Sequence, residues 1–203
     1  MRTSGLLFLL SLTLFGQGTE TKRAATEFPV QASLPGAQLG AEFMVRLISY
    51  GRESFVSDNF LVVEVALYPD KGSQIVIRPN EFTLRVNGKK ELLTPQAPQA
   101  VAMSISYPAW ESNPNAGAER FPGDPRARPM PGPPAPSVAA PEVEQKRLSP
   151  TEVITRSALP EGPRKTLASG YLFFPWRGNP ARLKTVEMMV TPESGSPVTV
   201  RLR

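Results

Sequence analysis

The stretch NFLVVEVALY (residues 59–68) is apolar on both faces of an extended chain. Alternate residues of a strand face opposite sides of a sheet, and here Glu64 is the only charged residue on either side. A strand of this kind is typical of the centre of a sheet whose two faces are both covered. We therefore expect residues 59–68 to be a central strand with a second layer on its outer side.

Shorter strand patterns surround this segment, and turn residues separate them. Asn87-Gly88 supplies the two positive-φ residues of a type I′ hairpin turn. Ser-Pro-Thr-Glu at 149–152 is a capping box and predicts a short helix that ends near Ala158. The pattern predicts an all-β fold, an antiparallel immunoglobulin-like β-sandwich with one short helix. The expected strands are 42–50, 59–68, 74–78, 81–86, 89–94, 101–107, 167–176, 181–190 (with a bulge at Lys184 or Thr185) and 197–202.

The first 18 residues have the pattern of a cleaved secretory signal. Arg2 precedes an apolar run at 6–15, and small residues follow at Gly16 and Gly18, so we expect cleavage before Thr19. A run of this length is about half of what a membrane-spanning helix needs. The chain is therefore expected to be secreted or periplasmic, with no transmembrane anchor after cleavage.

Composition divides the rest of the chain into four parts. Residues 19–40 are polar and interrupted by proline and glycine, which predicts a leader segment with room for one short strand at 27–32. Residues 108–148 contain ten prolines and almost no periodic apolar pattern, which predicts a long, Pro-rich, disordered insertion. The sandwich would then be built from residues 41–107 and 149–203.

Two stretches carry a resemblance to a known family. One is NEFTLRV at 80–86, followed by Asn-Gly-Lys at 87–89, and the other is GYLFFP at 170–175. Together they resemble the telokin-like, immunoglobulin-like domains of exported bacterial proteins of unknown function. The resemblance implies a fold and an extracytoplasmic setting, and it implies no catalytic residues.

The composition excludes several classes of chemistry. The chain contains no histidine and no cysteine, so no Ser-His-Asp triad, cysteine nucleophile or His/Cys zinc site can form. The sequence also lacks calcium-loop spacing and phosphate-binding glycine loops, and we expect no cofactor or metal. The formal net charge of +5 comes from scattered basic residues, which argues against a nucleic-acid partner.

Aromatic residues are the candidate binding surface. Trp110 and Phe121 lie in the Pro-rich insertion, and Tyr171, Phe173 and Trp176 lie on the expected strand 167–176. Such residues can serve as anchors for a partner. The competing interpretation for the strand aromatics is that they pack beneath another element, with the helix at 149–158 as the candidate. Trp110 and Phe121 could instead pin the insertion onto the sandwich.

These observations predict a non-enzymatic exported module that binds a protein or another cell-envelope component, or has a structural role in the envelope. One alternative is a carbohydrate-binding module that stacks Tyr171, Trp176 or Trp110 on sugar rings. A remote alternative is a carboxylate-dependent hydrolase that uses Glu64, which lies mid-strand among apolar neighbours.

Overall fold

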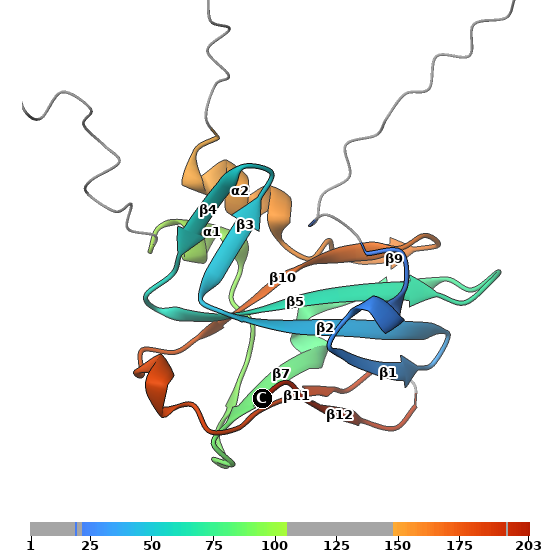
Figure 1. Ribbon diagram of the computed structural model, residues 1–203. Helices are drawn as coiled ribbons and strands as arrows, with labels where there is room; N and C mark the ends of the chain where they lie inside the picture. The colour runs from blue at the N-terminus through green and yellow to red at the C-terminus, as the bar shows by residue number, and fades with distance from the viewer. Residues whose placement is uncertain (1–18, 20–21, 105–147, 194) are drawn as a thin grey trace, which may run out of the picture.

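The computed structural model describes Thr19 and residues 22–104, 148–193 and 195–203. Two four-stranded antiparallel sheets dominate it (Figure 1). The first sheet has the strand order β1 (Val30–Leu34), β2 (Ala37–Val45), β5 (Phe60–Pro69) and β10 (Ala168–Pro175). The second has the order β12 (Val198–Arg201), β11 (Val186–Val190), β7 (Phe82–Val86) and β8 (Leu92–Leu93).

Shorter elements complete the described chain. Two two-stranded pairs lie outside the main sheets. One is the hairpin of β3 (Leu47–Tyr50) and β4 (Glu53–Val56), and the other joins the sequence-distant strands β6 (Ile75–Ile77) and β9 (Gly162–Arg164). The helices are α1 (Pro98–Ala102) and α2 (Pro150–Ser157), and the 3-10 turns are η1 (Ala25–Glu27), η2 (Pro79–Glu81) and η3 (Pro180–Arg182). The all-β prediction therefore holds at the level of antiparallel sheets, with two short helices rather than one.

The main hydrophobic core lies between the two large sheets. Every second residue of β5, from Leu61 to Leu67, points into it, and so do Leu172 and Phe174 of β10. Phe82 and Leu84 of β7 enter from the opposite sheet. These side chains are almost completely removed from water, which is the main favourable contribution to folding.

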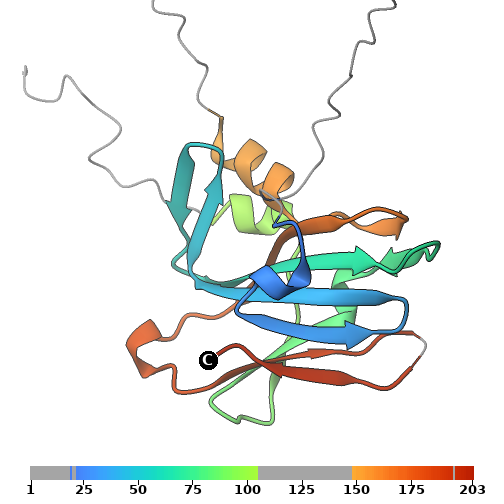
Figure 2. The ribbon, with the colours of Figure 1, turned by 45° about the vertical axis from the view of Figure 1, so that its right-hand side comes forward.

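A second core lies on the other face of the first sheet. Val62 and Phe173 belong to it, together with Val101 of α1, Ile154 of α2 and Phe55 of β4. The two helices and the β3–β4 hairpin form a third layer above the sheet (Figure 2). The prediction that residues 59–68 form a central strand covered on both faces is confirmed, since β5 pairs with both β2 and β10.

The expected leader differs most from the structure. Residues 30–40, predicted to be mainly polar leader, form β1 and the start of β2, with Leu34 opposite Ala37 in the hairpin register. Gly36 adopts φ +74 in the turn, a conformation that glycine reaches without strain. The strand expected at 27–32 is shifted to Val30–Leu34, where the side chains alternate between half-buried and exposed positions.

The segment expected as one strand at 42–50 is broken. Val45 has φ 60, and the register between β2 and β5 shifts between Phe43 and Val45. This bulge turns the chain out of the sheet, so that β3 pairs with β4 instead of continuing β2. The sequence does not reveal this break. A positive φ is rare for a β-branched residue, so it is not expected at Val45.

Two further strand predictions were wrong in part. Val101, expected to begin a strand at 101–107, lies in α1, which Pro98 starts in the first-turn position that suits proline. The expected strand 181–190 begins only at Val186, because η3 and an irregular segment occupy 180–185. Asn87 accounts for this segment: its Oδ1 accepts hydrogen bonds from the backbone N–H groups of Lys184 (2.7 Å) and Thr185 (3.2 Å).

Two local signals are confirmed. Asn87 and Gly88 have φ values of 53 and 67, and Lys89 N donates to Val86 O, as in a type I′ turn. Ser149 and Glu152 form the reciprocal capping box at the start of α2. The Pro-rich segment 108–148 lies outside the described residues except for Leu148. Among the helices of the described ranges, none has the length and apolar character that crossing a bilayer requires.

Candidate functional site: a cavity beside β6

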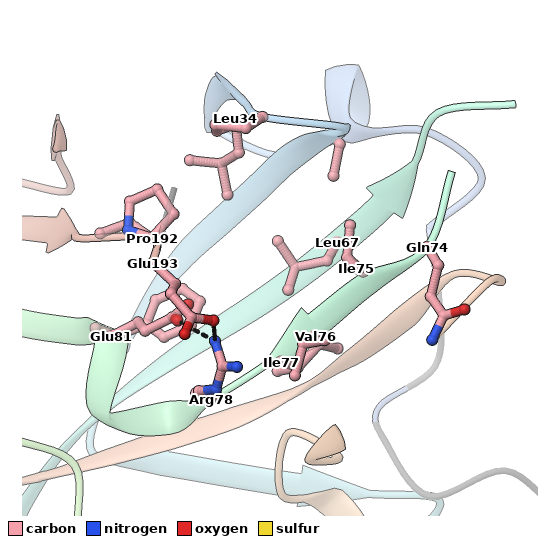
Figure 3. A pocket seen from close by; sticks show the side chains of 14 residues that line it. Leu34, Leu67, Gln74, Ile75, Val76, Ile77, Arg78, Glu81, Pro192 and Glu193 are labelled. Atoms are coloured by element: carbon pink, nitrogen blue, oxygen red, sulfur yellow. Dashed lines mark hydrogen bonds and ion pairs between the residues drawn. The ribbon is translucent and has the colours of Figure 1, made fainter. Parts of the chain in front are cut away.

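A cavity of about 220 Å³ opens at one end of the two large sheets (Figure 3). Its walls come from four separate parts of the chain: the β1–β2 turn, the end of β5, β6 with the residues that follow it, and the end of β11 with its loop. Leu67, Ile77, Phe82 and Val190 are buried side chains of this lining. The cavity therefore has an apolar floor that continues the main core.

Charged side chains stand on one rim of the cavity. Nη1 of Arg78 donates to Glu81 Oε1 (2.9 Å) and to Glu193 Oε2 (2.7 Å), and Figure 3 shows both interactions. The hydrogen bonds with Glu81 and Glu193 raise the pKa of the Arg78 guanidinium above its ordinary value. Glu193 keeps most of its side chain in solvent, so a competing charge can reach it. With one cation and two carboxylates, the rim is formally negative by one charge.

The strand beside the cavity has an open edge. Within the described part of the chain, β6 pairs only with β9, and no residue of β9 lines the cavity. The other edge of β6 has no strand partner among the described residues, and residues of β6 line the cavity. Val76 of β6 lines the opening and is 45% exposed. An edge strand of this kind offers free backbone donors and acceptors to another chain.

Two of the predicted binding residues are buried. Tyr171 is 4% exposed and Phe173 is 1% exposed, because the third layer of α1, α2 and the β3–β4 hairpin covers their face of β10. The Tyr171 hydroxyl donates to Ser49 O at 3.2 Å. Burial, and next the negative charge of Glu64, raise the pKa of the Tyr171 phenol. These two residues pack beneath a neighbouring layer that includes the helix at 150–157, and both line a second cavity of about 360 Å³. Their role in binding stays a prediction.

Trp176 is half-buried and lies against two neighbours, Arg46 and Gly178. The Arg46 guanidinium lies 5.6 Å from the centre of its ring, within the range of a cation–π contact. A side chain at Gly178 would overlap the indole ring. Arg46 also donates to Gly178 O at 2.8 Å, so the three residues form one contact cluster. The other two predicted residues, Trp110 and Phe121, lie outside the described residues.

Glu64 lies on the outer face of β5, in register with Glu42 of β2 and Tyr171 of β10. It is 7% exposed, so it is not open to a substrate in this structure. Within the described ranges, no group of three or more acidic side chains is placed to hold a metal ion.

Sequence reasoning missed the cavity because its lining comes from distant segments that carry no common motif. One local pattern points to part of the rim. Arg78 and Glu81 lie three residues apart on either side of Pro79-Asn80, a spacing at which their side chains can form an ion pair.

Comparisons with known proteins assign no family to the chain. No family model matches it, and no curated protein matches it. Among solved structures, the chain is similar to a candidate lipoprotein (ycdA) from Bacillus subtilis, with a TM-score of 0.36 and 14% sequence identity. The similarity covers 83% of this chain and 37% of the Bacillus chain, so this chain spans little more than a third of that protein.

Proposed function

We propose that this protein is a non-enzymatic, exported, immunoglobulin-like β-sandwich module that binds an extended segment of a partner protein at the β6 cavity. Export is supported by the signal pattern of residues 1–18. A non-enzymatic role is supported by the lack of histidine and cysteine in the whole sequence. The binding role rests on one observation, a cavity with an apolar floor and a charged rim that is lined by β6, a strand with one unpaired edge among the described residues.

The shape of the site favours a protein segment over a small molecule. Peptides that add to a sheet edge gain affinity from main-chain hydrogen bonds, and pockets beside the edge select their side chains. The cavity of about 220 Å³ is smaller than the roughly 300–1,000 Å³ of most small-molecule sites. It suits a single apolar anchor side chain that enters over Val76 and reaches the floor near Leu67.

The rim adds a preference for charge. Glu193 is exposed and its only partner among the described residues is Arg78. A basic side chain next to the apolar anchor would pair with Glu193 and reduce the excess negative charge. The proposed partner segment is therefore extended, with an apolar residue close to a lysine or arginine.

Site-specific photocrosslinking tests this proposal. A photoreactive residue at position 76 should give a discrete protein adduct in the envelope fraction of the producing cell. Position 56 is the matched control, because Val56 is 55% exposed but lies on β4, away from the cavity. The Glu193→Lys variant should reduce the adduct at position 76. Equal adducts at positions 76 and 56, or no effect of Glu193→Lys, would refute this site.

Glycan binding that disappears in Trp176→Ala, with no protein adduct at position 76, would instead support the carbohydrate alternative.

A further inference from the structure

A row of small residues crosses the outer face of the first sheet. Gly40 of β2 is in register with Ala66 of β5, and Ala66 is in register with Ser169 of β10. The beginning of the described chain lies over this row. A side chain at Gly40 would overlap the ring of Phe28, and Thr19 is bound to Ser169. The small residues therefore leave room for the N-terminal segment on the sheet.

Two hydrogen bonds hold Thr19 at this position. Its Oγ1 donates to Ser169 Oγ at 3.3 Å, and Ser169 Oγ donates to the backbone O of Thr19, also at 3.3 Å. Ser169 itself is 4% exposed. Thr19 is also the residue that the signal pattern predicts as the first of the exported chain.

The next row across the same face is acidic. Glu42, Glu64 and Tyr171 are in register on β2, β5 and β10. Like charges directly opposite each other across a strand pair are destabilising. Glu42 is paired with the ammonium of Lys22, whereas Glu64 is 7% exposed and has no hydrogen bond or ion pair with any other described residue. The Tyr171 hydroxyl points its proton at Ser49 O and so does not serve Glu64.

A buried carboxylate without a partner is costly, and a cation close to Glu64 would remove that cost. Ser169 and Glu64 are diagonal neighbours across the β5–β10 pair, a separation of roughly 7–8 Å between residues on one face. Thr19 is bonded through its hydroxyl and its carbonyl oxygen to Ser169, the diagonal neighbour of Glu64. In an uncleaved chain the backbone nitrogen of Thr19 is a neutral amide.

We propose that signal removal supplies the missing cation: the α-ammonium group of Thr19 forms an ion pair with the buried Glu64 carboxylate. Hydrolysis of the Gly18–Thr19 bond gives the hydroxyl of water to the Gly18 carboxyl group and a proton to the Thr19 amine. That amine then binds a second proton at neutral pH. The proposal rests on the export part of the proposed function and is independent of the β6 cavity.

A thermodynamic cycle on the chain 19–203 tests the pairing. Four proteins are compared by urea unfolding: a free or an acetylated Thr19 amine, each with Glu64 or with Glu64→Gln. Acetylation should lower the folding equilibrium constant about tenfold when Glu64 is present, a change of about 1.4 kcal/mol. It should change the constant less than about twofold in Glu64→Gln. The control Glu187→Gln removes a carboxylate of β11 on the other sheet and should keep the full acetylation effect.

A second measurement needs no variant. The rate at which an amine reagent modifies the Thr19 α-amine, followed by peptide mass spectrometry, should be much slower in the folded than in the urea-unfolded protein. Equal acetylation effects with Glu64 and Gln at position 64, or an unprotected α-amine in the folded protein, would overturn the pairing. A secreted protein that begins at a residue other than Thr19 would overturn it at the processing step. None of these three results bears on crosslinking at position 76.

Discussion

The side chain of Asn87 joins two parts of the chain that are almost a hundred residues apart. Its Nδ2 donates to Arg182 O at 2.9 Å, and its Oδ1 accepts from the N–H groups of Lys184 and Thr185. The change Asn87→Gly removes all three hydrogen bonds and keeps a residue that tolerates the φ of 53. One hydrogen bond contributes about 0.5–1.5 kcal/mol net to the free energy of unfolding. We use the lower end of this range because the three bonds lie close to solvent. We expect a loss of about 2 kcal/mol in the free energy of unfolding.

The change Asn87→Asp distinguishes the contribution of the side-chain donor Nδ2 from that of the acceptor Oδ1. It keeps the oxygen that receives the Lys184 and Thr185 bonds and loses only the donor to Arg182, so about 0.5–1 kcal/mol should be lost. Urea unfolding should therefore rank the stability as wild type, then Asn87→Asp, then Asn87→Gly. Amide hydrogen exchange at 184 and 185 should be faster in Asn87→Gly only. Wild-type stability and unchanged exchange in Asn87→Gly would refute the assigned role.

Three further changes address the outer layer. Phe173→Ala should lower the free energy of unfolding by about 3–5 kcal/mol in urea, since it empties a site that is 1% exposed; a loss below about 1 kcal/mol would contradict burial under the helices. The pKa of Tyr171 is raised above 10.0 by burial and then by Glu64, so its contribution to stability is present below pH 10 and is lost as the pH rises through the folded value. Tyr171→Phe should remove a late phase from the phenolate absorbance titration, and an unchanged titration would contradict the shift. Ser149→Ala should cost about 1 kcal/mol through loss of the α2 cap, and a thermal melt that matches wild type would argue against the capping box.

Patterns that depend on neighbouring residues were readable from the sequence. The two-sided apolar run of β5, the Asn87-Gly88 turn and the capping box at Ser149 each express a local rule, and the structure contains all three. The β1 strand was assigned to a polar leader because its Gln31 and Ser33 face solvent, and its apolar residues are only half-buried. An edge strand with few buried apolar residues shows only a weak alternating hydrophobic pattern in the sequence.

Features that depend on distant contacts were not readable. The bulge at Val45 directs the chain into the β3–β4 hairpin, whose apolar side chains pack in the second core. No conformational preference of the neighbouring residues requires this bulge. The irregular segment before Val186 is set by Asn87 from another hairpin. The cavity was not readable from the sequence for the same reason. Its lining residues Leu34, Leu67 and Val190 come from different strands and come together only in the folded sheets. The burial of Tyr171 and Phe173 on β10 also depends on distant contacts, because the layer that covers them comes from other parts of the chain.

The packing of α1 against α2 has a consequence for protein engineering. Both helices belong to the same buried cluster and contact each other, so Ser104, which follows α1, and Leu148, which precedes α2, lie at the same corner of the molecule. The entropy of closing a loop grows only slowly with its length, by about 0.6 kcal/mol for each doubling. A linker of about forty residues between Ser104 and Leu148 would therefore cost only about 1 kcal/mol more in loop closure than a linker of about ten residues. That corner is a permissive position for grafting an epitope tag or a reporter domain.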